Sequence, residues 1–417
     1  MAVSNAAQVR IYSQCAAGHD EALAALGIPC IEVCRATGMI WLEMLARVLH
    51  AIGLAATRQR NALSESLRRQ RSLVQGTCFV HLEIDMAMVE AWDMLRNEDR
   101  ALGMRMLTGA LEQARITNWQ SFTIIHATRM HRELLAEACD AGIEVDFAME
   151  LIRRYRMAPP ACATDRWPWL VKVRMLGGFE VHVDGALLIF SGKVPKKPLA
   201  LLKAIIALGT PTASAARLKD ALWPDEDGDA ARKSLDVTIG RLRKLLGRND
   251  AVVVSDESVS LNPRLCWVDV WMFVREAEAA GKTADRVPAY RLACDRYQGA
   301  LLPGDLETPW TLMRREQLRR RFIHLVQAVG EDAEQKGDWE DAIAWYLRGM
   351  QADELAETFH QGVMRCNLAL GRYAEGMSAY RRLRQTLSVV LGIVPSEQSQ
   401  ALARSLQCDG AGRDGVA

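Results

Sequence analysis

The fold prediction starts from residues 232–246, which read RKSLDVTIGRLRKLL. At about 100° per residue, one narrow stripe of such a helix is entirely aliphatic and is expected to be buried. This stripe consists of Leu235, Ile239, Leu242 and Leu246. The opposite side carries Lys233, Val237, Gly240, Arg241 and Lys244, with Thr238 and Arg243 at its margins. The stretch therefore predicts an amphipathic helix with one apolar and one cationic side.

The segments around this helix predict a winged helix-turn-helix domain over residues 167–262. Alternating apolar and polar residues predict the strands, and apolar residues three and four apart predict the helices. Strands are expected at 171–175, 181–183, 187–190, 251–254 and 258–261, and helices at 198–208, 214–223 and 230–246, the last capped by Asp229. An order of strands, three helices and a closing hairpin is typical of this domain.

The cationic side of the helix suits the major groove of DNA. Basic residues at both ends could contact phosphates, while small residues in the middle let the backbone approach the base edges. Arg241 could bind guanine through two hydrogen bonds, and Val237 could contact a thymine methyl group. Thr238 could form a hydrogen bond with either strand of the DNA. The alternative is an ordinary solvated helix face. The charges alone favour that alternative, whereas the surrounding order of elements favours DNA binding.

The chain outside this domain predicts helices throughout. Residues 1–158 are rich in helix-forming residues, and a proline-containing linker follows at 159–166. The pattern is helical again over 268–406, and residues 407–417 are predicted to be a disordered tail. We therefore expect a mainly α-helical, multi-domain chain in which a small α+β domain is flanked by helical regions.

The second helical region contains an internal repeat. GDWEDA at 337–342 recurs as GRYAEG at 371–376, and Tyr346 recurs as Tyr380. The offset is 34 residues, which is the period of tetratricopeptide repeats. In such a unit the glycine permits close packing and the aromatic residue fills a gap between helices. The sequence therefore predicts tetratricopeptide-like packing in this region.

Composition and motifs argue against an enzyme, a metal site and a membrane protein. Lys and Arg number 52 and Asp and Glu 51, so a uniformly basic, histone-like coat is excluded. The ten cysteines form no CxxC pair, and no HExxH, GxSxG or GxxxxGK(S/T) motif occurs. The most apolar stretch, residues 39–57, is interrupted by Glu43, Arg47 and His50. We expect a cytoplasmic protein without catalytic residues, cofactor or metal.

Several short motifs, in their chain order, resemble a family of bacterial regulators. They are LGGFEV at 176–181, DG at 184–185, LWP at 222–224, ARKSLDV at 231–237 and RLRKLLG at 241–247. These motifs are similar to OmpR-type winged helices, most of all to those of the antibiotic-regulatory-protein (SARP) class of activators. In that class a bacterial transcriptional activation domain follows the winged helix. Residues 268–406 resemble it through DVWMF at 269–273, LLPG at 301–304, Trp310, RRE at 314–316 and LGIVPS at 391–396.

The resemblance implies which residues meet DNA and RNA polymerase. The recognition-helix positions are Arg232, Lys233, Val237, Thr238, Arg241, Arg243 and Lys244. The loop that meets RNA polymerase in such proteins corresponds to Trp223, Pro224, Asp225 and Glu226. Relatives usually occupy direct repeats in promoter DNA as dimers, so a homodimer is expected. Two departures predict weaker or different binding: the wing turn at 255–258 is acidic, and Gly240 stands where arginine is frequent.

The N-terminal helices resemble the last superhelical part of the large MalT-like signalling ATPases. A WPW stretch at 167–169 leads into the winged helix, as in some of those proteins. The sequence has no phosphate-binding loop of its own. The alternatives are that the chain is a truncated or divergent relative of those proteins, or that it is one half of a split protein; a separate signalling ATPase or a ligand at these helices is one expected partner.

Two functional hypotheses follow from the sequence. The first is an activator that binds promoter DNA through the winged helix and contacts RNA polymerase. The second is a non-enzymatic helical-repeat scaffold or signalling adaptor whose winged helix docks protein. Residues 167–262 carry 14 Lys and Arg against 11 Asp and Glu, and this net charge of +3 is modest for a DNA-binding domain.

Overall fold

The computed structural model describes most of the chain and divides it into two compact units. The described residues are 6, 9–14, 17, 19–75, 80–97, 99–118, 129–190, 194–209, 212–255, 257–282, 286–305 and 308–413. The units are residues 1–169 and 170–417. Asp256 of the predicted wing turn and residues 414–417 of the predicted tail lie outside the described residues.

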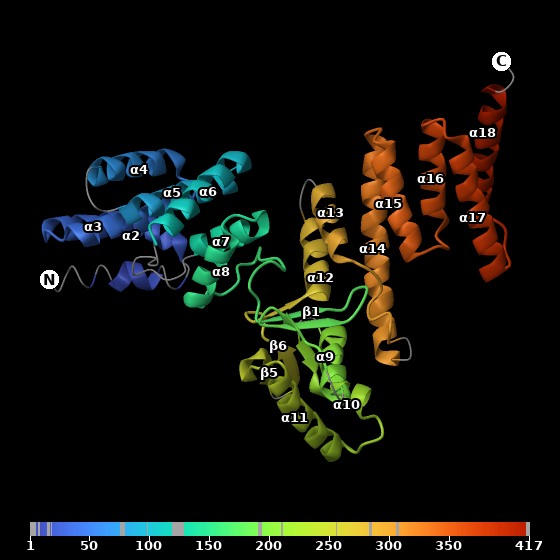
Figure 1. The fold of residues 1–417 in the computed structure, drawn as a ribbon, viewed down its shortest axis with the longest axis horizontal. Helices are drawn as coiled ribbons and strands as arrows, with labels where there is room; N and C mark the ends of the chain where they lie inside the picture. Colours follow the sequence, from blue (N-terminus) through green and yellow to red (C-terminus); the bar gives the residue numbers. More distant parts are fainter. Residues whose placement is uncertain are drawn as a thin grey trace. The chain divides into compact units, whose positions relative to one another are not determined.

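The first unit is helical, as predicted (Figure 1). Its helices are α2 (Asp20–Ala36), α3 (Ile40–Ala56), α4 (Arg60–Val74), α5 (Val80–Arg96), α6 (Arg100–Ile116), α7 (Arg129–Ala141) and α8 (Val145–Arg154). Helices α2 and α3 pack so closely that a Cβ on Gly53 would lie 2.2 Å from the backbone nitrogen of Ala24. The unit extends past the expected linker to Trp169, whose indole N–H donates to the carbonyl of Thr164 at 2.6 Å.

The second unit begins with the winged helix, built from two small sheets and three helices. The strands are β1 (Val171–Arg174), β2 (Glu180–Val183), β3 (Ala186–Leu187), β4 (Thr212–Ser214), β5 (Val252–Ser255), β6 (Ser258–Leu261) and β7 (Cys266–Val268). The sheets have the orders β3-β2-β1-β7 and β4-β6-β5. The helices are α9 (Lys196–Leu208), α10 (Ala215–Leu222) and α11 (Gly228–Leu245), and a short 3-10 turn, η1 (Asn249–Ala251), follows α11. The predicted order of strands, helices and hairpin is confirmed.

Three details of this domain differ from the prediction. Helix α11 is capped by Asp227, not Asp229, because the Asp227 carboxylate accepts the Ala230 N–H at 2.8 Å. The strand expected at 187–190 is only β3, and Ile189 is exposed beyond it. Strands β4 and β7 were not predicted. Each has three residues and forms only by pairing with a strand distant in sequence, β6 and β1 respectively.

Helices make up the rest of the second unit. They are α12 (Asp269–Ala280), α13 (Val287–Arg296), α14 (Pro309–Gln335), α15 (Trp339–Ala352), α16 (Glu357–Ala369), α17 (Tyr373–Leu391) and α18 (Glu397–Arg413). Figure 1 shows α14 to α18 side by side, and each packs against the next or next but one. Helix α18 continues to Arg413 and so includes part of the segment expected to be a disordered tail.

The predicted repeat corresponds to equivalent positions in two helix pairs. Gly337 and Gly371 both have left-handed backbone, with φ of 77° and 69°, and each lies two residues before the aromatic residue that begins α15 or α17. The Tyr346 ring lies between α14 and α16. A Cβ on Gly330 would lie 2.6 Å from this ring, and one on Gly362 would lie 2.4 Å from it. These two glycines permit close helix packing around Tyr346. Gly337 of the repeat does not have the predicted packing role, because a Cβ there would meet no atom within 4 Å; its left-handed backbone is what favours glycine.

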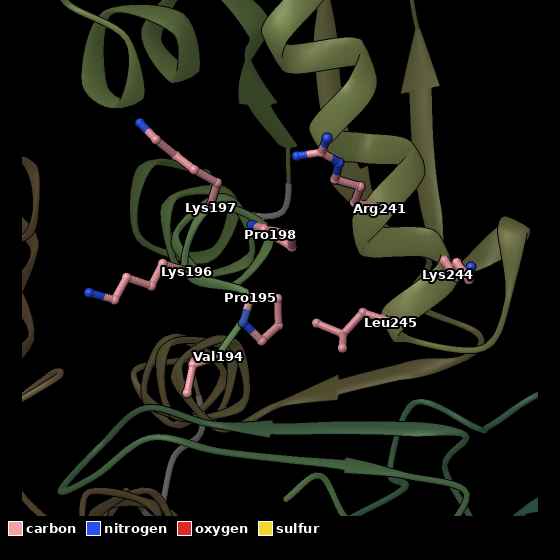
Figure 2. Close-up of a pocket in the computed structure, with 8 residues that line it drawn as sticks. All are labelled: Val194, Pro195, Lys196, Lys197, Pro198, Arg241, Lys244 and Leu245. Carbon is pink, nitrogen blue, oxygen red and sulfur yellow. The ribbon is translucent and has the colours of Figure 1, made fainter. Parts of the chain in front are cut away.

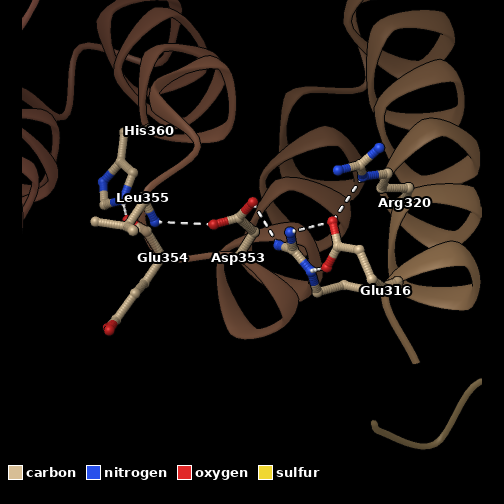
Figure 3. A network of polar contacts seen from close by, with 7 residues as sticks. Glu316, Arg320, Asp353, Glu354, Leu355 and His360 are labelled. Atoms are coloured by element: carbon tan, nitrogen blue, oxygen red, sulfur yellow. Dashed lines mark hydrogen bonds and ion pairs between the residues drawn. The ribbon is translucent and has the colours of Figure 1, made fainter. Parts of the chain in front are cut away.

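A polar network joins α14 to the turn between α15 and α16 (Figure 3). Arg319 donates to the Asp353 carboxylate at 2.6 Å and also pairs with Glu316. Hydrogen bonds from Arg319 and Arg320 lower the pKa of Glu316 to about 2. Asp353 also accepts the Leu355 N–H at 3.2 Å. The network fixes this turn against α14.

The winged helix and the following helices share one hydrophobic core. Strand β7 pairs in parallel with β1 and leads directly into α12. The buried Asp269 carboxylate accepts the N–H groups of Met175 and Leu176 at 2.8 and 2.9 Å. Lys203 of α9 forms an ion pair with Asp305 at 2.6 Å. These contacts connect the two parts of the second unit into a single packed body.

Candidate nucleic-acid interface

Helix α11 has the two sides that the sequence predicts. Leu235, Ile239, Leu242 and Leu246 are buried. Arg232, Lys233, Val237, Gly240, Arg241 and Lys244 are exposed, and Val237 is 53% exposed although it is aliphatic. A cationic side with a small, apolar centre therefore faces away from the core, as an amphipathic helix of this pattern requires.

Two of the predicted DNA-contact residues are turned away from this exposed side. Thr238 is only 4% exposed, and its hydroxyl donates to the carbonyl of Ser234 at 2.7 Å. It lies three residues after Leu235 and four before Leu242, so it belongs to the buried stripe. Arg243 is half-buried and donates to the carbonyl of Val252 through Nε at 3.2 Å and Nη2 at 2.8 Å. The expectation that both residues present their side chains on the exposed side is therefore wrong: Thr238 is buried, and Arg243 is bonded to the wing.

The loop before α11 is fixed at both ends. Trp223 is buried, with the Lys197 amine 5.3 Å from the centre of its ring, so this member of the predicted polymerase loop is not available at the surface. Pro224, Asp225 and Glu226 are exposed. Glu226 accepts the Ser234 hydroxyl at 2.7 Å, which ties the loop to the first turns of α11. The exposed part of the loop is therefore held in place beside the helix.

An open pocket of about 700 Å³ lies between the start of α9 and the second half of α11 (Figure 2). It is lined by Val194, Pro195, Lys196, Lys197, Pro198, Arg241, Lys244 and Leu245. In Figure 2 the side chains of Lys197 and Arg241 extend to the same side, and Pro195 faces Leu245. Lys196 and Lys197 were not among the site residues predicted from the sequence. The sequence shows that they are adjacent and positively charged, but it gives no sign that they lie near Arg241, more than forty residues later.

The wing follows α11 as a two-stranded hairpin. Strands β5 and β6 pair from Val252 opposite Leu261 to Ser255 opposite Ser258. Val253 and Val254 are 45% and 46% exposed, and Glu257 is exposed at the turn. The described part of the wing tip therefore presents an acidic side chain and no basic one.

The described residues contain no group of three or more His, Cys, Asp or Glu arranged to hold a metal ion. Within the same ranges, every helix is too short or too polar to cross a lipid bilayer.

Comparisons with known proteins find similarity in the second unit and around it. Residues 268–407 match the family model described as bacterial transcriptional activator domain. Regulatory protein AfsR of Streptomyces coelicolor is 27% identical over 219 residues, which cover 50% of this chain and 22% of that protein. Regulatory protein AfsR of Streptomyces griseus is 26% identical over 236 residues, covering 54% and 23%. The chain therefore carries a bacterial transcriptional activator domain and is similar over about half of its length to these regulatory proteins.

The match spans less than a quarter of the length of these two curated relatives. Among solved structures, EmbR of Mycobacterium tuberculosis in complex with a low-affinity phosphopeptide is similar at a TM-score of 0.44 and 20% sequence identity. That match covers 59% of this chain and 69% of the EmbR chain.

Proposed function

We propose that this chain is a SARP-class activator that binds promoter DNA through the exposed side of α11 and contacts RNA polymerase through the loop before it. The observation that carries the proposal is the cationic side of α11. Arg232, Lys233, Arg241 and Lys244 are exposed, and none of them forms an ion pair with another described residue. Asp229 and Asp236 are also exposed on α11, but the exposed basic residues outnumber them. Net positive charge on an exposed helix favours a polyanion.

The centre of this side suits close contact with bases. Gly240 has no side chain, and a Cβ there would meet no atom within 4 Å. No side chain therefore keeps a bound molecule away from the helix backbone at this point. Val237 and Arg241 lie on either side of it in sequence and are exposed. Arg241 can reach guanine with two parallel hydrogen bonds, and Val237 can contact a thymine methyl group. Thr238 and Arg243 are left out of the proposed contact set because their donors bond within the domain.

The proposed polymerase contact consists of Pro224, Asp225 and Glu226. Trp223 anchors the loop in the core, and the acidic side chains remain at the surface. An acidic loop held beside a DNA-binding helix can meet a basic protein surface next to the promoter. The homodimer on direct repeats, and an ATPase or ligand at the N-terminal helices, stay predictions from the family resemblance.

The wing supports the second candidate function, protein docking. Exposed Val253 and Val254 together with the acidic Glu257 are unusual where a wing enters a DNA groove. In the docking alternative the winged helix belongs to a scaffold or signalling adaptor, and α11 binds no DNA.

A salt titration of DNA binding separates these candidates. The full chain is first used to select duplexes from a random pool, and affinity is then measured between 50 and 300 mM salt. We expect a log–log slope of roughly −4 or steeper, because four to six phosphates are neutralised per protomer. A flat response, or no binding at the lowest salt, would support the docking function instead.

A further inference from the structure

We propose that the pocket between α9 and α11 holds phosphates of the DNA backbone, so that α9 forms part of the DNA-binding surface. This inference rests on the proposed function, because it requires DNA on the exposed side of α11. It adds Lys196 and Lys197, which lie outside the recognition helix, to the contact surface, and it assigns Lys244 to phosphate rather than to bases.

The charges around the pocket are of one sign. Lys196, Lys197, Arg241 and Lys244 line it, and no carboxylate does. None of the four forms an ion pair with a residue in the described ranges. Like charges gathered without counter-charge repel one another, and an anion placed among them removes this repulsion. The free protein therefore has an electrostatic reason to bind an anion at this place.

The arrangement of the pocket favours a defined phosphate position over a diffuse ion atmosphere. The Lys197 amine donates to the carbonyl of Leu222 at 2.8 Å and lies over the Trp223 ring, so this charge is already held in place. Val194, Pro195 and Leu245 form apolar walls, and walls of low polarity strengthen the field of nearby charges. Pro195 and Pro198 have no N–H group, so the side chains rather than the first amides of α9 supply most of the donors.

The position of Arg241 connects the pocket to DNA. Arg241 lies on the exposed side of α11 and also lines the pocket. If Arg241 reads a base in the major groove, the adjoining pocket is close to the phosphates that border that groove. Lysines suit these phosphates because each supplies a compact point charge. The contacts should be independent of base sequence.

The test compares Lys196→Ala, the double variant Lys196→Ala with Lys244→Ala, and Lys282→Ala in the full chain. Lys282 is exposed, lies in the activation domain away from the pocket, and carries the same charge. Its replacement therefore controls for the change in net charge. Lys196→Arg is a second control that keeps the charge at the pocket. Affinity is measured against salt on the selected duplex and on a scrambled duplex of the same length.

We expect the slope of log affinity against log salt to become shallower by about 1 for Lys196→Ala and about 2 for the double variant. At −0.9 per phosphate, each contact contributes about an eightfold factor in affinity at 0.1 M relative to 1 M salt. The loss should be equal on both duplexes, and Lys196→Arg should retain the wild-type slope. Lys282→Ala should match the wild type.

The outcomes separate the failure of this inference from the failure of the proposed function. If the wild type binds DNA with a steep slope but Lys196→Ala and the double variant behave like Lys282→Ala, the pocket does not hold phosphate and the activator proposal stands. If Lys196→Ala lowers affinity only on the selected duplex, Lys196 contacts a base and the phosphate assignment is wrong. If the wild type binds no DNA, both proposals are wrong.

Discussion

Arg241 and Arg243 lie two residues apart on α11, and replacing each with alanine should affect a different property of the protein. Both were predicted from the sequence to contact DNA. The structure leaves Arg241 exposed, whereas Arg243 donates two hydrogen bonds to the Val252 carbonyl and so joins α11 to β5. We expect Arg243→Ala to reduce the stability of the winged helix and Arg241→Ala to reduce the sequence preference of DNA binding.

The size of the stability effect follows from these contacts. Two N–H donors of a charged group meet one backbone carbonyl, at 3.2 and 2.8 Å. Because Arg243 is only half-buried, their loss should lower the free energy of unfolding by about 1–2 kcal/mol. In a unit of this size, that corresponds to a decrease in melting temperature of about 2–8 °C. Arg241→Ala removes an exposed side chain and should change stability by less than about 0.5 kcal/mol.

The DNA-binding effects should differ in the same pair. Arg241→Ala should cost about 1–3 kcal/mol on the selected duplex and much less on a scrambled duplex, because a base contact is lost. Arg243→Ala should weaken both duplexes alike and only slightly. Arg243→Lys serves as the matched control, since it keeps the charge but loses the forked geometry.

Thermal unfolding and duplex titration of the purified full-length variants provide the two measurements. The assignment of Arg243 to the contact with β5 is refuted if Arg243→Ala has the same melting temperature as the wild type and abolishes the preference for the selected duplex. Arg243 would then read DNA. Equal weakening of both duplexes by Arg241→Ala would make Arg241 a phosphate contact instead.

Two further predictions concern the loop before α11 and the junction with the activation domain. Asp225→Ala should reduce transcription from a target promoter in vitro by roughly twofold to fivefold without changing DNA affinity, because an exposed charge pair contributes about this much. The control is Asp220→Ala, which removes an exposed carboxylate of α10. Equal transcription by both variants would show that Asp225 does not contact the polymerase. Burial raises the pKa of Asp269 to about 6. Because the folded state holds this proton more tightly than the unfolded state, the stabilising contribution is complete below about pH 4 and is lost as pH rises to 6. The stability of the wild type relative to Asp269→Asn should therefore fall by up to about 3 kcal/mol over this range, and a difference that is constant with pH in thermal unfolding would contradict the assignment.

Some features of the site could be predicted because they depend on neighbours along one helix. The spacing of Leu235, Ile239 and Leu242 identified the buried side of α11 correctly, since the helix fixes about 100° per residue. The margins of that side were less certain. Thr238 and Arg243 could face either way by angle alone, and their placement depends on the Ser234 carbonyl and on strand β5.

Other features could not be predicted because they depend on contacts across long stretches of chain. Strand β7 has three residues and gains its hydrogen bonds from β1, almost a hundred residues earlier. Asp269 reads as an ordinary acidic residue at a helix start, yet its carboxylate accepts N–H groups from the end of the first strand. Short strands and buried polar partners of this kind have no periodic signal in the sequence.

The sequence by itself determined the elements of this protein: the two-sided helix α11, the order of the winged helix, and the 34-residue repeat marked by Gly337 and Gly371. These follow from local backbone geometry, which repeats every few residues. Only the tertiary structure decided which charged residues gather at one place. It brought Lys196 and Lys197 beside Arg241 and Lys244 and turned Arg243 toward Val252, because the packing of α9 and β5 against α11 depends on the whole core.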